Sequence, residues 1–174
     1  MRFAELIHII KADLRHHGAR SLLKSVDVYL FNPSFRLVLN YRVGRYLYLG
    51  NKLFKFLSRY YAYRQVTKRG CQISFRSVIG NNIYFPHPIG IVIGDHVVIG
   101  NQVKIWQQVT LGSHGREGEP LSYPVIKDEV KLFAGAKIFG SIVLESKAVV
   151  GANAVVNKDV PAGRIAVGIP AVIK

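Results

Sequence analysis

The chain has 174 residues, 49% of them hydrophobic, and a formal net charge of +14 at pH 7. This length suits one domain, or one domain with an appended segment, and the hydrophobic content suits a folded core. The sequence contains neither the run of about 18 apolar residues that a membrane span requires nor the pattern of a secretory signal peptide, so we expect a cytoplasmic protein.

Residues 1–70 carry most of the charge. They hold 14 Lys and Arg against three acids, a net charge of +11, together with 12 of the 19 aromatic residues. A segment of this kind either contacts the anionic inner face of a membrane or covers apolar surface with its Arg and Lys stems. Both interpretations stay open. We expect no nucleic-acid binding, because no recognition motif is present.

The same segment predicts helices. Apolar residues recur near helical spacing in residues 3–31, and Asn-Pro-Ser at 32–34 interrupts the pattern. Ser34 is placed to cap a further helix over 35–49, and another helix is expected over 52–66. Three or four helices are thus predicted to pack on the first coil of the region that follows, whose open end needs a cap.

From residue 71 onward the sequence repeats every six residues. Neither a helical nor a strand period explains this spacing, whereas hexads are typical of a parallel β-helix, in which three hexads make one coil. We therefore expect a mainly β region of about four coils over residues 71–174. The first positions of the hexads are Ile73, Ile79, Phe85, Ile93, Ile99, Ile105, Leu111, Ile126, Leu132, Ile138, Leu144, Val150 and Val156.

The repeat breaks twice. The hexad after Phe85 is two residues too long, and His87 lies in this excess between two prolines. The hexad after Leu111 is nine residues too long, and its Gly-rich and polar sequence predicts one loop, at about 112–125, extruded from a corner. Because insertions in repeat proteins often lie on the binding face, both breaks are candidate functional positions.

The hexads, the phrases HPIGIVIG and VKIWQQVTLGS, the loop and the ending VVGANAVVNKDVPAGRIAVGIPAVI resemble the serine acetyltransferase-like group of hexapeptide-repeat acyltransferases. The likeness covers about residues 70–174. The phrase NPSFRLVLNYRVGRYL looks like the region before the β-helix in members from bacterial surface-polysaccharide pathways. Membership implies a left-handed coil, a homotrimer, and acetyl-CoA bound between neighbouring subunits.

The resemblance also implies roles for single residues. His87 matches the family histidine that acts as general base before an x-x-G-I-V segment, a task that suits its near-neutral pKa. The other histidines, at 8, 16, 17 and 96, are expected away from the site, and no metal is expected. Lys158 is a candidate partner for a CoA phosphate. Four positions match residues that contact acetyl-CoA in the family: Gly112, Ala134, Gly135 and Ala152.

The sequence departs from the serine-specific members in three places, one of them a pair of residues. Gln72 and Pro86 stand where those members carry aspartates, and Ser122 and Tyr123 stand in place of an Arg-His pair. Free serine is a zwitterion whose recognition needs charged partners. We therefore expect O-acetylation of a sugar in a polysaccharide or its lipid-linked precursor, with Tyr123, His114 and Gln72 as acceptor contacts. Serine O-acetylation with altered acceptor residues is the alternative.

Without the two aspartates, His87 lacks an obvious carboxylate to orient it. Gln72 is one candidate to hold the imidazole. Three acids, from the same or a neighbouring subunit, are further candidates: Asp95, Glu117 and Glu119. Two functions of a different class also stay open, a non-catalytic scaffold and a β-helix metalloenzyme. The metalloenzyme would need three histidines that converge at a subunit interface, and His87, His96 and His114 do not resemble the spacing of that family.

Overall fold

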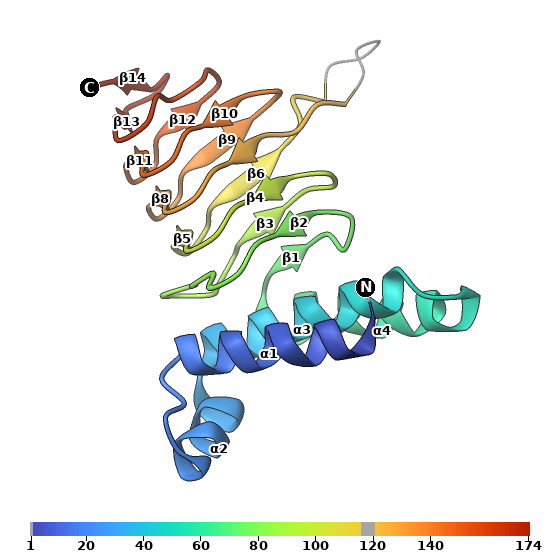
Figure 1. Cartoon of the computed structure of the whole chain (residues 1–174). Coiled ribbons are helices and arrows are strands. Elements are labelled where there is room, and N and C mark those ends of the chain that lie inside the picture. Colours follow the sequence, from blue (N-terminus) through green and yellow to red (C-terminus); the bar gives the residue numbers. More distant parts are fainter. Residues whose placement is uncertain (1, 116–120) are drawn as a thin grey trace.

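The computed structural model describes residues 2–115 and 121–174, which form a left-handed parallel β-helix preceded by four helices. Figure 1 shows the short strands stacked as a column, with the helices beneath its first coil. The strands are β1 (Gln72–Ile73), β2 (Val78–Ile79), β3 (Val92–Ile93), β4 (Val98–Ile99), β5 (Lys104–Ile105), β6 (Thr110–Gly112), β7 (Val125–Ile126), β8 (Lys131–Leu132), β9 (Lys137–Phe139), β10 (Val143–Leu144), β11 (Val149–Val150), β12 (Val155–Val156), β13 (Ile165–Val167) and β14 (Val172–Ile173).

The helices agree in number with the prediction, but one cap differs. They are α1 (Phe3–His16), α2 (Leu22–Phe31), α3 (Pro33–Tyr48) and α4 (Lys52–Arg69). Asn32, not Ser34, caps α3, because the Asn32 side chain accepts the N–H of Phe35 at 2.9 Å and Pro33 fits the first helical position. Ser34 is instead buried in the first turn. None of the described helices is both long and apolar enough to cross a bilayer.

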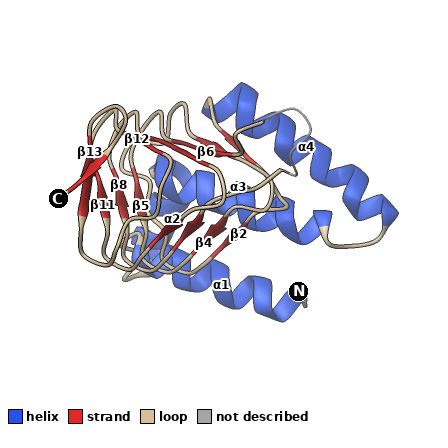
Figure 2. Ribbon diagram, turned by 90° about the horizontal axis from the view of Figure 1, so that it is seen from above, coloured by secondary structure: helices blue, strands red, loops and turns tan. Residues whose placement is uncertain are grey.

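The strands form three sheets, which are the three faces of the column (Figure 2). Face A holds β1, β3, β6, β9 and β12; face B holds β2, β4, β7 and β10; face C holds β5, β8, β11, β13 and β14. Neighbouring strands are parallel, and β13 with β14 is the exception. On face A, Gln72 pairs with Val92, Val92 with Thr110, and Thr110 with Lys137. Both sequence insertions are therefore absorbed at corners, and the pairing register of the faces is kept.

The core is a continuous column of hexad side chains. In most two-residue strands the first residue faces outward and the second is buried. All thirteen first positions are buried, and none is more than 6% exposed. Burying one Ile or Leu side chain contributes about 1.5–3 kcal/mol. The hexad period thus predicts the core correctly.

Helix α3 closes the lower end of the column. Backbone N–H groups of each coil donate to carbonyls of the next coil, as from Val78 to Val97, so the carbonyls of the first coil lack donors from below. The guanidinium of Arg42 provides a donor to two of these carbonyls, that of Ile79 at 2.7 Å and that of Gly80 at 2.6 Å. Its Nε also pairs with the buried carboxylate of Asp13 at 2.9 Å. The predicted packing of helices on the first coil is confirmed.

Candidate active site

His87 lies in the turn that carries the chain from face C to the start of β3 on face A. Tyr84 bridges to Lys104 on face C just before this turn. The N–H of Ile89 donates to the His87 carbonyl at 2.8 Å, so the turn is tight. The imidazole itself is exposed, and the two extra residues therefore present the histidine to solvent.

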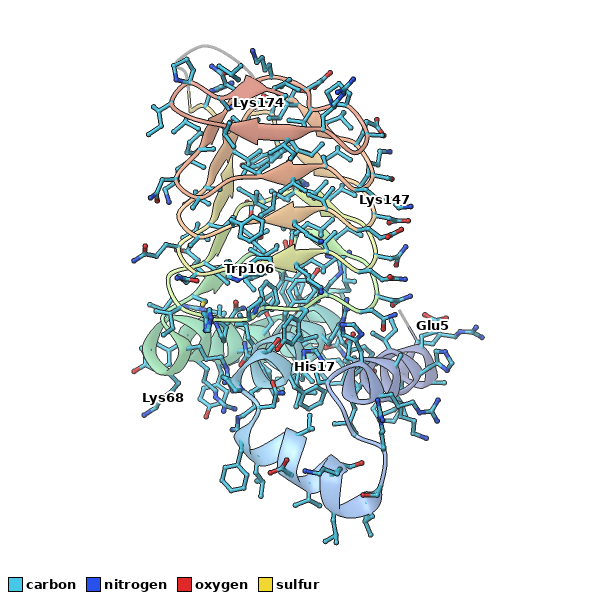
Figure 3. All side chains as sticks on the ribbon, turned by 90° about the vertical axis from the view of Figure 1, so that its left-hand side faces the viewer. Glu5, His17, Lys68, Trp106, Lys147 and Lys174 are labelled. Atoms are coloured by element: carbon cyan, nitrogen blue, oxygen red, sulfur yellow. The ribbon has the colours of Figure 1, made fainter. Side chains whose placement is uncertain are left out.

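A cavity of about 350 Å³ adjoins His87. It lies between the histidine turn, the start of α3 and the end of α4. Two of its side chains, Lys68 and Arg69, are cationic; in Figure 3 the label of Lys68 marks the end of α4 beneath the first coil. The cavity is lined by Pro33, Leu37, Lys68, Arg69, Pro86, His87, Pro88 and Ile89. A compound with a negative group would be electrostatically favoured here.

A buried hydrogen-bond chain holds the segment that leads into this turn. The N–H of Phe85 donates to Ser34 Oγ at 3.0 Å. His17 Nδ1 lies 2.7 Å from the Asp13 carbonyl and must donate to it, so His17 Nε2 accepts the Ser34 hydroxyl at 2.9 Å. Burial lowers the pKa of His17, which agrees with a neutral ring. We expected His17 to lie away from the site. In the fold, the hydroxyl of Ser34 links His17 by hydrogen bonds to Phe85, which is two residues before His87.

The turn that carries His87, which we call the histidine turn, is the lowest of the turns that lead from face C to face A. These turns stack along one edge of face A, and we call this stack the corner column. His87, Ala134, Gly135 and Ala152 all lie at this corner, and Ala134 and Ala152 are one coil apart. Three backbone hydrogen bonds join successive levels: Gln108 N–H to the Ile89 carbonyl at 2.9 Å, Gly135 N–H to the Gln107 carbonyl at 2.9 Å, and Asn153 N–H to the Ala134 carbonyl at 2.8 Å. The candidate base and three candidate donor contacts therefore share one edge.

Two features of this corner column bear on its fit to a pantetheine arm. The Gln107 Oε1 is buried and has no hydrogen-bond partner among the described residues, so it can accept an amide N–H of a bound arm. Gly135 has a φ of +74°, and a Cβ there would overlap the Asn153 side chain. Close stacking of the coils thus accounts for this glycine. Nearby, Trp106 stacks on Phe133 with ring centroids 4.5 Å apart.

Four further candidate residues lie at the opposite edge of face A: Gly112, His114, Tyr123 and Lys158. His87 precedes β3, whereas Gly112 ends the parallel neighbour β6. His114 lies over Gly140, and Tyr123 contacts His96 edge-on with ring centroids 5.8 Å apart. Six extended residues span roughly 20 Å. One subunit therefore does not bring Tyr123 and His114 to its own His87.

Gln72 occupies a third place. It begins β1, directly below Val92 on face A. It lines a cavity of about 460 Å³ between α4 and the first coil, together with Tyr48 and Arg59. No hydrogen bond joins its side chain to His87 within the described residues, so its predicted role in holding the imidazole stays a prediction.

The acids expected to orient His87 do not meet it within the described chain. Asp95 follows β3 at the opposite edge of face A, where it pairs with Arg76 at 3.2 Å and accepts the Ser74 hydroxyl. The prediction is therefore wrong for Asp95 of the same subunit. Glu117 and Glu119 lie outside the described residues.

The three histidines named for a metal site do not meet within one chain. His96 and His114 are separated from His87 by the width of face A. The described ranges contain no group of three metal-ligating side chains close enough to hold an ion.

No family model matches the chain. It is 36% identical over 168 residues to the serine acetyltransferase of Buchnera aphidicola, a match that covers 97% of this chain and 60% of that protein. The structure of soybean serine acetyltransferase complexed with serine is similar with a TM-score of 0.86 and 34% identity, over 98% of this chain and 70% of that one. A serine acetyltransferase solved in complex with CoA gives a TM-score of 0.84 and 32% identity, over 99% and 70%.

These relatives do not support the resemblance to members from polysaccharide pathways. The chain spans about 60% of the length of the first curated relatives that it matches. The matches to the Buchnera protein and to the soybean structure nevertheless cover 97% and 98% of this chain. The chain belongs to the serine acetyltransferase family.

Proposed function

We propose that the chain is an O-acetyltransferase that transfers the acetyl group of acetyl-CoA to the hydroxyl of serine, with His87 as general base. One observation carries this proposal: an exposed histidine at the foot of a corner column, beside a cavity lined by Lys68 and Arg69. Relatives named for this activity, one solved with CoA and one with serine, support both substrates.

In the proposed reaction, the imidazole of His87 removes the proton from the acceptor hydroxyl. The oxygen then attacks the thioester carbonyl carbon, and the carbon–sulfur bond breaks. The imidazolium returns its proton to the departing thiolate, so His87 ends in its starting state. Lys68 and Arg69 attract the carboxylate of serine, and Gln107 accepts an amide N–H of the pantetheine arm.

A sugar hydroxyl is the second candidate acceptor. Gln72 and Pro86 replace two family aspartates, and within the described part of the chain no carboxylate adjoins His87 to bind the amino group of serine, which favours a neutral acceptor. The cationic cavity favours serine. Thiol release from acetyl-CoA, measured with serine and with a panel of sugars, separates the two. Faster turnover with a sugar than with serine would overturn the serine assignment.

The role of His87 has a direct test. General-base catalysis contributes about 10²–10⁴-fold to rate, so His87→Ala should lose at least that much turnover. The ring is exposed and lies outside the core, so the melting temperature of this variant should stay unchanged. His8→Ala, which removes another exposed histidine, is the matched control. An active His87→Ala protein contradicts the assignment.

The separation of His87 from the loop edge supports a site shared between subunits. We propose a homotrimer in which the edge of one subunit that carries Tyr123 faces the His87 edge of the next. His87→Ala and Tyr123→Ala chains, each inactive alone, should then regain activity when they are coassembled. Sedimentation equilibrium gives the oligomeric state, and a fully active monomer would contradict this arrangement.

Contact with an anionic membrane is a separate proposal for the helical segment. Leu22, Leu23 and Phe31 on α2 are 82%, 84% and 75% exposed, and α2 projects away from the column (Figure 1). Arg20 and Lys24 provide positive charge beside them. Exposed apolar and basic groups together favour an anionic lipid surface. Cosedimentation with phosphatidylserine vesicles, lost in a Leu22→Ser/Leu23→Ser protein, tests it.

A further inference from the structure

A second cavity, of about 300 Å³, lies within the helical segment. We call it the arginine cavity, because three guanidinium groups from α3 and α4 line it and no acidic side chain does. Its lining consists of Tyr29, Arg36, Leu39, Asn40, Val43, Tyr61, Arg64 and Arg69. Arg69 also lines the cavity beside His87, so the two cavities meet at this side chain.

The three arginines of the cavity differ in their surroundings. Arg36 donates to the carbonyls of Leu30 at 3.1 Å and Tyr29 at 3.3 Å, near the C-terminus of α2. The guanidinium of Arg64 lies 5.7 Å from the ring centre of Tyr60. The Nε of Arg69 is enclosed without a hydrogen-bond partner among the described residues. The fold thus positions Arg36 and Arg64 by contacts and leaves a buried donor of Arg69 unpaired.

The three positive charges repel one another. Burial lowers the pKa of Arg69, and the charges of Arg36 and Arg64 lower it further. Across residues 2–115 and 121–174, no carboxylate forms an ion pair with any of the three. Gathering like charges around a partly buried space is unfavourable unless an anion occupies it.

Asn40 adds an acceptor to this cationic wall. Its side chain is 3% exposed, and its Nδ2 donates to the Tyr61 carbonyl at 3.0 Å. This bond fixes the amide, but the Oδ1 is buried without a partner within the described chain. Buried acceptors are normally satisfied. The cavity therefore offers many donors for an anion and one acceptor for a hydroxyl group.

We propose that the arginine cavity binds a small hydroxylated phosphate ester, whose phosphate oxygens accept from Arg36, Arg64 and Arg69 and whose hydroxyl donates to Asn40. Three guanidinium groups match a dianionic phosphate better than a single carboxylate, and their forked donors suit its oxygens. The volume is at the lower end for ligand pockets, which fits a compound of a few carbons. This site shares Arg69 with the cavity beside His87, but the proposal does not rest on acetyl transfer.

Titration calorimetry of the full chain tests the proposal, with inorganic phosphate and glycerol 3-phosphate as probes. We expect one site per chain, with glycerol 3-phosphate bound more tightly than phosphate. Arg64→Gln should weaken both at least about tenfold, which is about 1.4 kcal/mol. Arg20→Gln removes an exposed arginine outside the cavity and should bind both probes as the wild type does.

Thermal melts separate lost binding from lost folding. Phosphate should raise the melting temperature of the wild type and not that of Arg64→Gln. Without phosphate, Arg64→Gln should melt at or above the wild-type temperature, because one repulsive charge is gone. A lower melting temperature without phosphate would show that Arg64 serves the fold and would overturn the proposal.

Three further results would also overturn it. The first is no binding of either probe at about 20 mM, and the second is unchanged binding in Arg64→Gln. The third is tighter binding of malonate than of phosphate, which would assign the cavity to carboxylates. CoA binding is measured in parallel. If Arg64→Gln weakens CoA as much as phosphate, the cavity belongs to the acetyl donor and a separate site is ruled out.

Discussion

Replacing Ser34 by alanine tests whether the helical segment positions the catalytic turn. The Ser34 hydroxyl is the middle link of the buried chain from Phe85 through Ser34 to His17, with bonds of 3.0 Å and 2.9 Å. Alanine removes the acceptor of the Phe85 N–H and the donor to His17 Nε2. Phe85 is 1% exposed and His17 8%, so water does not readily replace either bond.

Leaving one buried polar group unpaired costs about 1–3 kcal/mol. With two such groups and some local relaxation, we expect Ser34→Ala to lose about 2–4 kcal/mol of the free energy of unfolding. For a chain of this size, each kcal/mol lowers the melting temperature by roughly 2–4 °C, so the expected decrease is about 5–15 °C. The turn that carries His87 also loses an anchor, so kcat should fall while the KM for acetyl-CoA stays unchanged.

Thermal melts give the stability change, and amide hydrogen exchange at Phe85 reports the lost bond directly. Ser25→Ala is the matched control, because the exposed Ser25 hydroxyl donates only to the Ser21 carbonyl of its own helix turn. A loss below about 0.5 kcal/mol, with unchanged exchange at Phe85, would refute the anchoring role.

Three further predictions concern the fold. Arg42→Met should lose about 3–5 kcal/mol in denaturant melts by leaving buried Asp13 unpaired, and Asp13→Leu added to it should restore part of that loss. Burial lowers the pKa of His17 in the folded chain, so the unfolded chain takes up this proton at a higher pH. The melting temperature should therefore fall as pH drops below about 6.5, and it should fall less steeply in the His17→Gln variant. Gly135→Ala should lower the melting temperature, because its Cβ overlaps the Asn153 side chain and its φ is strained. Adding Asn153→Ala should remove the overlap but not the strain, so it should restore the melting temperature only in part.

The hexads predict the β-helix well because each one reports a physical constraint. A side chain that points inward every six residues must be apolar, and all thirteen predicted positions are buried. The same spacing also indicates where the insertions lie. His87 precedes Ile93, and the loop follows Leu111, which is one coil later on the same face. The two insertions therefore lie at opposite edges of face A.

The helical segment is less predictable, because long-range packing decides its details. Asn32 and Ser34 are both good capping residues, and Pro33 at the first helical position favours Asn32. Ser34 is left free to bind Phe85, which is 51 positions away. No local pattern in the sequence indicates that bond, nor the meeting of Arg36, Arg64 and Arg69 around one cavity.

The Arg42 contacts with the first coil also limit how this molecule can associate. A stack of parallel strands with bare ends is a template on which another stack can grow into a fibre. Here the guanidinium occupies carbonyls at the lower end, and at the upper end β14 runs antiparallel to β13 and covers the edge of face C. The carbonyls of Ile79 and Gly80 at the lower end and the edge of face C at the upper end are therefore already paired, and they offer no free groups to the strands of a second column.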